Sequence, residues 1–406
     1  MPVADQQTEI RSSSASYRAV PSVLVTIAFV GSLLLWLRTQ DGLGRLPSDP
    51  GYDYFIAASE RGWASIWTPD PFPQVVSRFV ALCAVQFPVD RHALAAGSIT
   101  NVLWVGLAVA VGYIVWHQWQ SARLAVSIGL LFVLNPVAQE SALLNHGNLK
   151  WPLLSVALIA ISSPTFLRSH SGLISALLIL TGVSQPVVFV AVVPIIVVAM
   201  LDHNRNTRVI AIVFITVLVC TAYQVLATGL DRSASGHGTS RILRPWPNMG
   251  VFWWFGLFGP MIMAVIAIVL SLRGARSGNE GKITVLALSI SSIVLGVSSY
   301  RLGGIADRYF VTPMFLSSVS AVLVMRSLWN QGARWLQSEI ILGFAALLLP
   351  SAQWFSVSSW LSSGPKWSEE ATRGADICAD PDIVSVSMGV TPVGTTEVPC
   401  ALLHDN

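Results

Sequence analysis

Charged residues are scarce in this sequence. They make up 11% of its 406 residues, against about 25% in an ordinary soluble domain. Hydrophobic residues make up 53%, and the mean hydropathy is +0.63. This balance excludes a soluble globular protein and predicts an integral membrane protein. The net charge of +3 is small and the basic residues are scattered, so we expect no nucleic-acid partner.

Several motifs are absent as well. The sequence has neither a GxGxxG nor a Walker-type loop for nucleotide phosphates. No small-residue cleavage site follows the first apolar run, so we expect that run to be a retained span and not a signal peptide. No cysteines have metal-ligand spacing, and we predict no cofactor. The acid-rich first loop would be compatible with a divalent cation but does not require one.

Apolar runs define the predicted topology. A bilayer core of about 30 Å needs about twenty apolar residues in a helix. The stretch 172–201 is too long for one span, and "SQP" at 184–186 breaks it, so we expect a helical hairpin there. The sequence therefore predicts an all-α polytopic membrane protein with about 11 spans. Besides the hairpin, spans are expected near 20–38, 94–116, 122–138, 152–167, 208–227, 251–272, 283–299, 308–326 and 339–356.

The distribution of Lys and Arg orients these spans. With the N-terminus inside, the cytoplasmic segments hold 11 basic and 5 acidic residues, and the longer outer segments hold 13 basic and 16 acidic residues. Cytoplasmic loops are enriched in Lys and Arg, so we expect a cell-membrane protein with a cytoplasmic N-terminus and an extracytoplasmic C-terminus. The expected parts are a cytoplasmic tail at 1–19, a transmembrane domain at 20–356 with a large outer loop at 39–93, and an outer tail at 357–406.

The outer tail contains two of the four cysteines, Cys378 and Cys400. They are either unrelated thiols or a disulfide, and an oxidising compartment favours the disulfide in a short segment with little core. The tail stretch "DIVSVSMGV" alternates as a strand does. We therefore expect a small disulfide-stapled β element.

The first outer loop contains two stretches that read as short helices. They are "YFIAASERGWASIW" and, after the turn "TPDPFP", "QVVSRFVALCAVQF". The second is too short to span a membrane, and its apolar residues leave a polar or small stripe at Gln74, Ser77, Arg78 and Ala81. This spacing is typical of a helix that lies in the membrane interface.

A third polar segment, "NHGNLKW" at 145–151, separates two apolar runs. Gly147 and its flanking Asn residues would suit a tight turn between two helices. The alternative is a binding wall, because the predicted topology brings a dense set of polar groups to the outer interface, where they need partners. That set is Glu140, Asn145, His146, Asn148, Lys150 and Trp151.

One span, then a large outer loop with acids and interfacial helices, then many further spans, resembles the GT-C superfamily of membrane glycosyltransferases. The segments "DYFIAASERGWASIWTPDPFP", "ESALLNHGNLKW" and "DRYFVTP" also resemble a group of uncharacterised GT-C-like bacterial proteins. The likeness runs from about residue 20 to about residue 326. It implies an enzyme that transfers a sugar, with inversion, from a polyprenyl-phosphate carrier to a cell-envelope glycan or lipid acceptor.

Such a transfer needs a carboxylate to take the proton of the acceptor hydroxyl. Asp53 in "GYDYF" resembles the loop acid of the superfamily and is the first candidate for this base. Its structural alternative is a helix N-cap, which requires no chemistry. Asp49 is the second candidate.

The departing phosphate needs cations or hydrogen-bond donors. Arg78, Lys150, Arg301 and Arg308 are the candidates, and the Arg308–Tyr309 pair also resembles the family pattern of an Arg-Tyr pair entering a late span. For each cation the structural alternative is a boundary residue that extends its charge to the lipid headgroups.

Two other functions compete with glycosyl transfer. One is a transporter or flippase for a lipid-linked sugar, which the scarcity of charge within the spans and the lack of a duplicated half do not favour. The other is a non-catalytic scaffold whose tail binds an envelope partner. Acids in the first loop that can be replaced without loss would distinguish the scaffold from the enzyme.

Overall fold

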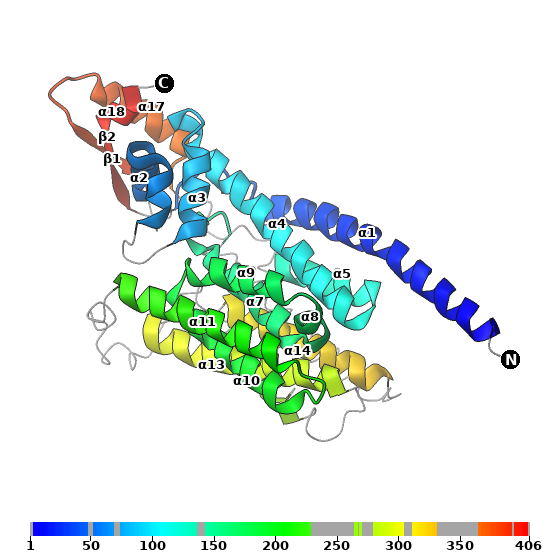
Figure 1. Ribbon diagram of the computed structural model, residues 1–406. Coiled ribbons are helices and arrows are strands. Elements are labelled where there is room, and N and C mark those ends of the chain that lie inside the picture. The colour runs from blue at the N-terminus through cyan, green and yellow to red at the C-terminus, as the bar shows by residue number, and fades with distance from the viewer. Residues whose placement is uncertain are drawn as a thin grey trace.

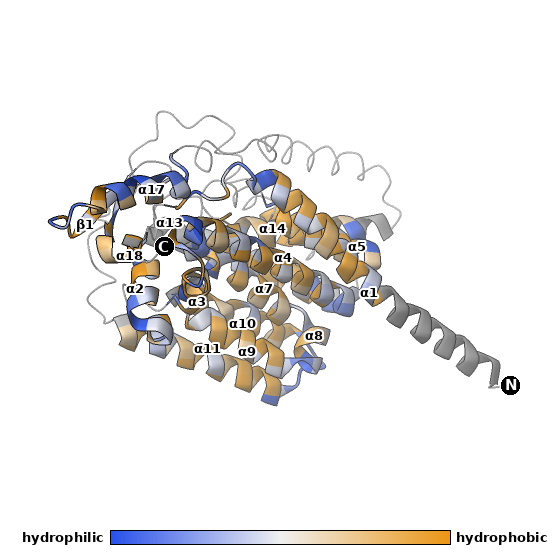
Figure 2. Ribbon diagram, turned by 90° about the horizontal axis from the view of Figure 1, so that it is seen from above, coloured by the Kyte–Doolittle hydropathy of each residue, from blue (hydrophilic) through white to orange (hydrophobic). Residues whose placement is uncertain are grey.

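The computed structural model describes residues 3–47, 52–68, 74–135, 143–228, 264–266, 268–269, 279–303, 311–330, 364–391 and 394–404. Within these ranges the chain is mostly helical, and its helices form a bundle with a smaller unit at one end (Figure 1). Hydrophobic residues dominate the bundle helices, whereas the C-terminal helix α17 is largely hydrophilic (Figure 2). This contrast follows the composition of the segments and is what a bundle surrounded by lipid requires.

The first half of the chain forms α1 (Val3–Thr39), α2 (Asp53–Arg61), the 3₁₀ helix η1 (Gly62–Trp67), α3 (Val75–Ala84), η2 (Val89–Arg91), α4 (His92–Trp119), α5 (Ala122–Val133), η3 (His146–Asn148), α7 (Lys150–Ser162), α8 (Pro164–Ser169), α9 (Ser171–Gly182), η4 (Pro186–Ala191) and α10 (Val192–Leu201). The second half forms α11 (Thr207–Thr228), α13 (Asn279–Gly303), α14 (Val311–Asn330), α17 (Trp367–Cys378), β1 (Ser385–Gly389), β2 (Thr395–Pro399) and α18 (Cys400–His404).

Four helices in the described residues are long and apolar enough to cross a membrane. They are Val20–Thr39, Val89–Trp119, Thr207–Ala227 and Glu280–Ser298. Five other apolar helices are shorter, and two of them, α5 and α9 with 12 residues each, would extend for only about 18 Å. The chain is therefore an all-α membrane protein in its apolar part. The expected run at 339–356 lies outside the described residues, as does nearly all of the run at 251–272.

Proline residues divide two of the expected apolar stretches into separate helices. The hairpin at 172–201 breaks where "SQP" predicted it, because α9 ends at Gly182 and η4 begins at Pro186. The run at 152–167 also divides, since α7 ends at Ser162 and α8 begins at Pro164. Proline lacks an amide hydrogen and fits best in the first turn of a helix, which accounts for both new starts.

Helix α7 forms the centre of the bundle. Every residue from Trp151 to Ser162 is buried, and the helix packs against α4, α9, α13 and α14. A helix that is apolar on all sides suits such a position. The hydroxyl of Ser155 is satisfied within the helix by donating to the carbonyl oxygen of Trp151 at 3.1 Å.

Glycines allow the helices around α7 to approach one another closely. A Cβ at Gly112 of α4 would lie 2.2 Å from Ile27 Cδ1 on α1, and one at Gly182 of α9 would lie 2.4 Å from Cys220 Cβ on α11. Small residues at such crossings are the usual means by which membrane helices pack. These contacts fix α1 against α4, and α9 against α11.

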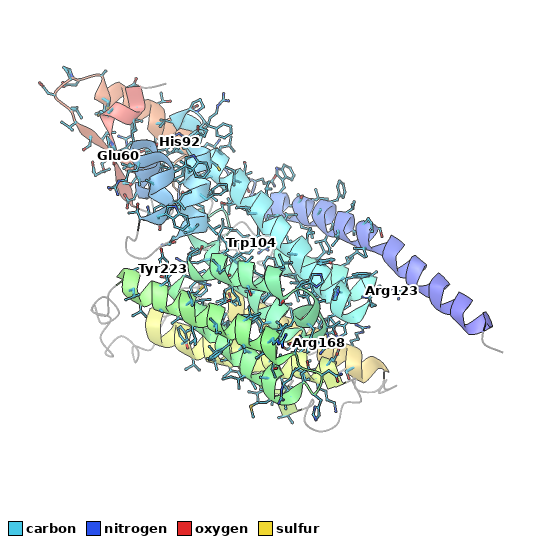
Figure 3. The ribbon with its side chains drawn as sticks, in the orientation of Figure 1. Glu60, His92, Trp104, Arg123, Arg168 and Tyr223 are labelled. Carbon is cyan, nitrogen blue, oxygen red and sulfur yellow. A yellow bond between two sulfur atoms is a disulfide. The ribbon has the colours of Figure 1, made fainter. Side chains whose placement is uncertain are left out.

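The two ends of the bundle differ in their polar residues. Glu60 and His92 lie at one end, and Arg123 and Arg168 lie at the other (Figure 3). At the second end, the Arg168 guanidinium bridges Asp202 at 2.6 Å and Glu280 at 2.5 Å. Arg168, Asp202 and Glu280 all lie in segments between the predicted spans that the sequence analysis assigns to the cytoplasmic side.

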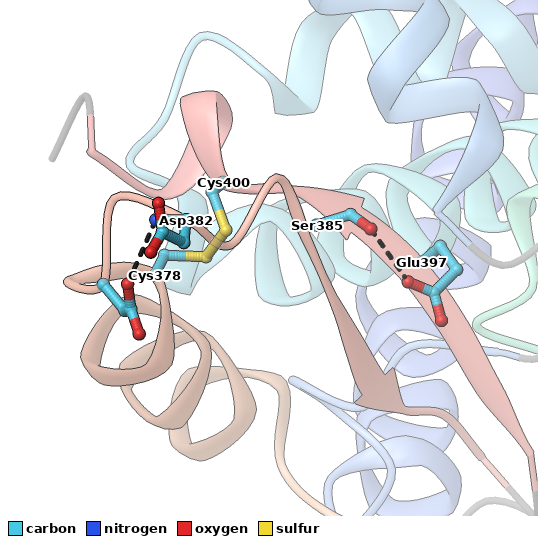
Figure 4. Close-up of a disulfide and its surroundings, with 6 residues drawn as sticks. Cys378, Asp382, Ser385, Glu397 and Cys400 are labelled. Atoms are coloured by element: carbon cyan, nitrogen blue, oxygen red, sulfur yellow. Dashed lines mark hydrogen bonds between the residues drawn. A yellow bond between two sulfur atoms is a disulfide. The ribbon is translucent and has the colours of Figure 1, made fainter.

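The unit at the first end includes the C-terminal segment. Strands β1 and β2 pair antiparallel with Ser387 opposite Glu397, and Cys378 is bonded to Cys400 with their Cα atoms 5.4 Å apart (Figure 4). The predicted disulfide and the predicted strand are thus both confirmed. Val386, on β1, is buried between exposed neighbours, as the alternating sequence indicated.

This C-terminal segment packs on the first loop. The backbone N–H of Trp367 donates to Gly44 O, and that of Thr391 donates to Leu46 O, both at 2.8 Å. The indole Nε1 of Trp367 donates to Val89 O, also at 2.8 Å. The loop and the tail, more than 270 residues apart in sequence, therefore form one unit beside the bundle (Figure 1).

Candidate functional site

The polar stripe of α3 faces the inside of the protein. Gln74, which precedes the helix, and Ser77, Arg78 and Ala81 are all buried, whereas Phe79 is 39% exposed. The spacing of apolar residues in the sequence predicted this amphipathic helix, but it did not predict what the polar face of the helix contacts. That face meets η1, α2 and the segment that begins α7, and these contacts define the candidate site.

Arg78 is held between α2 and η1. Its guanidinium carbon lies 4.5 Å from the centre of the Tyr54 ring, and its Nη1 donates to Ser65 O at 3.4 Å. A cation over an aromatic face contributes about 0.5–2 kcal/mol, with the larger values at desolvated sites. Only 4% of Arg78 is exposed, so this cation is part of a protein interior and not a headgroup contact. The boundary-residue interpretation does not apply to it in this structure.

His146 also contacts Tyr54. Its ring is fully buried and meets Tyr54 edge-on at 6.0 Å and Phe55 edge-on at 5.3 Å, both distances being between ring centres. The turn before it is under strain, because Leu144 has a φ of +61°, which is uncommon for a residue other than glycine. Such strain costs about 1–3 kcal/mol and persists only where surrounding contacts enforce it.

The two asparagines of the segment "NHGNLKW" have different roles in the structure. The side-chain oxygen of Asn145 accepts from the N–H of Gly147 at 2.9 Å, which is the local turn that the structural interpretation predicted. Asn148 is buried in η3, and its N–H donates to Asn145 O. Trp151 is also buried, and its carbonyl oxygen accepts from the Thr312 hydroxyl at 2.8 Å. Asn145 thus shapes the segment that presents His146 and Lys150.

Lys150 completes the cluster from the first residue of α7. Its ammonium donates to Gln74 Oε1 at 3.3 Å, and Gln74 lies four residues before Arg78 on the same face. Gln185, in the α9–η4 break, donates from Nε2 to the carbonyl oxygen of Lys150 at 3.0 Å. The remaining oxygen of Gln185, Oε1, is buried and has no hydrogen-bond partner within the described part of the chain.

Asp53 lies at the water-exposed edge of this cluster. It is the first residue of α2, with Tyr52 at the N-cap position, and its side chain is exposed. The next two residues, Tyr54 and Phe55, are buried and carry the contacts to Arg78 and His146. A carboxylate in the first turn is favoured by the helix dipole. The acid and the two aromatic residues that contact Arg78 and His146 therefore belong to one short helix.

The structure brings Arg78 of the second predicted loop helix together with His146 and Lys150 of the segment 145–151. Asp49, Glu140, Arg308 and Tyr309 lie outside the described residues. Trp63 and Trp67 of η1 are 71% and 61% exposed and lie on the outer surface of the loop unit.

Sequence reasoning missed Tyr54, Gln185 and Arg38. Gln185 had a signal, since it is a polar residue between two apolar runs, but "SQP" was interpreted only as a helix break. Arg38, at the end of the first span, is fully buried and donates to the carbonyl oxygens of Val133 and Asn135. A cation at these carbonyls suits the C-terminal end of α5.

Tyr52 and His92 form a hydrogen-bonded pair beneath the site. The Tyr52 hydroxyl lies 2.7 Å from His92 Nδ1, and His92 Nε2 lies 2.9 Å from Phe87 O. Since a carbonyl oxygen only accepts, Nε2 carries the proton, and in the neutral ring Nδ1 accepts from Tyr52. Burial raises the pKa of the Tyr52 hydroxyl, which keeps it protonated as a donor.

Among the described residues, no three His, Cys, Asp or Glu side chains are grouped so as to hold a metal ion. The site combines a buried cation, Arg78, and a partly buried one, Lys150, with two carboxamides and an imidazole, and it has an acid at its exposed edge. Such a set can bind an anion and orient hydroxyl groups. No protein-family model and no curated protein matches this chain.

Proposed function

We propose that this membrane protein is a GT-C-type glycosyltransferase. It would transfer a sugar from a polyprenyl-phosphate carrier to an acceptor of the cell envelope, on the extracytoplasmic side, with its N-terminus in the cytoplasm. The observation that carries the proposal is the meeting of Arg78 with His146 and Lys150, from two distant segments, beside the helix that begins at Asp53. Burying polar side chains beside an apolar bundle costs free energy unless they are hydrogen-bonded, and ionisable residues at such positions usually mark functional sites.

In the proposed reaction the Asp53 carboxylate takes the proton of an acceptor hydroxyl. The hydroxyl oxygen then forms a bond to the anomeric carbon, and the bond from that carbon to the phosphate oxygen breaks. The polyprenyl phosphate leaves with the electron pair, and Arg78 and Lys150 stabilise its charge. A single displacement of this kind inverts the anomeric centre. Asp49 is the second candidate for the base, and Arg308 and Tyr309 are further candidate contacts to the donor.

The contacts between the loop unit and the bundle support an approach to the site from both lipid and water. The N–H of Val76 at the start of α3 lies 3.4 Å from the Ser184 hydroxyl at the end of α9, so the loop unit meets the bundle there. Near this junction Leu180 and Phe189 of the bundle are exposed, as is Phe79 of α3. We propose that lipid covers these apolar side chains and that α3 lies at the membrane interface. The carrier would then approach from the lipid and the acceptor from water.

Expression in a matched deletion strain, followed by profiling of the envelope glycans, tests the proposal. The variants Asp53→Asn and Arg78→Gln are expected to lose the restored sugar, whereas Glu60→Gln is the matched control. Glu60 is an exposed acid on the same helix as Asp53. Asp49→Asn is made alongside, since it decides between the two candidate bases. Restoration by Asp53→Asn and Asp49→Asn equal to wild type would exclude both acids as the base.

The same variants separate transfer from transport. A flippase for lipid-linked sugar would move a labelled carrier across proteoliposomes without forming a glycosidic bond, and it would not need the Asp53 carboxylate. Transport that survives Asp53→Asn, with no product formed by wild type in the presence of acceptor, would identify the alternative function.

A further inference from the structure

A column of aromatic rings connects the C-terminal tail with the candidate site. The Trp367 ring stacks on Tyr52 at 4.7 Å, and Tyr52 stacks on Phe55 at 5.0 Å, measured between ring centres. Phe55 then meets the buried His146 edge-on at 5.3 Å. The rings of three segments that are distant in sequence, the tail, the start of α2 and η3, thus contact one another in an unbroken series.

The tail end of this column is firmly anchored. Trp367 is almost fully buried and makes two hydrogen bonds to the first loop, one from its backbone and one from its indole nitrogen. Tyr52 is fixed through its hydroxyl, which is bonded to His92. The Cys378–Cys400 disulfide and Thr391 hold the rest of the tail in place. The rings therefore have little freedom to shift independently.

Helix α2 needs such support. It has 9 residues, and isolated helices shorter than about 12 residues are marginal in water. Its buried residues are Tyr54, Phe55 and Ala58, so its position depends on what packs against these side chains. One neighbour of Phe55 is Tyr52, which also stacks against the tail residue Trp367.

We infer that Trp367 is a positioning residue: the docked tail sets the position of α2 through the ring column and thereby fixes Tyr54 and His146 in the candidate site. This positioning role of Trp367 does not depend on the proposed function. Only its effect on sugar transfer rests on that proposal. The inference assigns the tail a role within this chain, in contrast to a tail that serves to bind an envelope partner.

Hydrogen exchange of the full chain in lipid nanodiscs, followed by mass spectrometry, tests the inference. Trp367→Ala removes the terminal ring, and we expect exchange in residues 145–149 to become about tenfold faster, the factor that one lost aromatic pair corresponds to. Trp367→Phe keeps a ring but not the indole hydrogen bond, and it should restore protection. Val384→Ala is the control, because Val384 is a tail residue with 83% exposure. Helix α11 should exchange equally in all variants.

A second variant covers the case in which Trp367→Ala unfolds the whole loop unit. Phe55→Leu keeps an apolar side chain but removes the ring in the middle of the column. It should raise exchange in 145–149 while 367–378 remains protected. Unchanged exchange in 145–149 in this variant would overturn the inference. A defect in Trp367→Phe as large as in Trp367→Ala would also overturn it, since the indole bond to Val89 would then be the determinant.

The same variants connect the column to the proposed reaction. Loss of the envelope sugar with Trp367→Ala and its recovery with Trp367→Phe would extend the role to activity. If no variant of the chain forms a sugar product but the exchange pattern is as expected, the proposed function fails and the positioning role stands.

Discussion

The contact between Gly112 and Ile27 gives a quantitative test of the fold. An alanine Cβ at Gly112 would lie 2.2 Å from Ile27 Cδ1, and Ile27 is fully buried, so its side chain has no open space to enter. The next atom of another residue, Ala125 O, is 3.4 Å away, an ordinary contact. The clash therefore falls on a single methyl group. Overpacking of this kind costs about 1–3 kcal/mol, and we expect Gly112→Ala to lower the unfolding free energy by that amount.

A double-mutant cycle isolates the methyl group. Ile27→Val removes Cδ1 and should cost about 1 kcal/mol by itself. In that background Gly112→Ala should lose most of its penalty, which gives an interaction energy of about 1–2 kcal/mol. Gly106→Ala is the control on the same helix, because a Cβ there meets nothing within 4 Å. It should be neutral or stabilising by up to about 1 kcal/mol.

Unfolding of the purified chain in mixed micelles, titrated with sodium dodecyl sulfate, provides these free energies. If Gly112→Ala proved as harmless as Gly106→Ala, α1 would not cross α4 at this point. An equal penalty for Gly112→Ala in both backgrounds would mean that the strain arises elsewhere than at Ile27.

Three further predictions concern the loop unit and the site. Replacing Cys378 and Cys400 together by Ser should destabilise the tail by about 3 kcal/mol, the chain-entropy value for a loop of 22 residues, and limited proteolysis should then cut the tail first. Arg373 lowers the pKa of Glu370 below its usual 4.5, so their pair stabilises the tail above about pH 4.5 and this contribution is lost as the pH falls through the lowered value. Glu370→Gln should therefore cost about 0.5 kcal/mol at pH 7, a small value because the Arg373 side chain is 46% exposed, and thermal melts should converge with wild type in acid. Arg78→Lys should reduce sugar transfer at least about tenfold while the melting temperature changes little, because a lysine lacks the planar donor group; equal activity would argue against a phosphate contact.

Local signals in the sequence predicted much of this fold. Hydropathy predicted the membrane class, "SQP" predicted the break between α9 and η4, and alternation predicted the strand β1. The membrane class, the helix break and the strand each depend on residues that are close in sequence, and the pattern of apolar residues indicates such local features directly. The pairing of Cys378 with Cys400 followed from their shared segment and compartment.

Contacts between segments that are distant in sequence could not be predicted from these local patterns. Nothing near Trp367 in the sequence indicates that its indole would bind the carbonyl of Val89. The stripe of α3 showed which residues share a face, but burial of Arg78 beneath Tyr54 depends on how α2 folds back over it. Gln185 was hidden for the same reason, since a helix break and a binding residue have the same local pattern.

Helix α2 contacts both the protein interior and the water-exposed surface. Its buried side, with Tyr54 and Phe55, faces Arg78 and His146, whereas Asp53 at its first residue is exposed. In the proposed reaction the phosphate requires buried, desolvated cations, where electrostatic stabilisation is strong, and the acceptor hydroxyl arrives from water. An acid on the exposed edge of the helix that covers the cations meets both requirements. Because the tail braces this helix through Trp367 and Tyr52, the separation between acid and cations depends on contacts made by the last part of the chain.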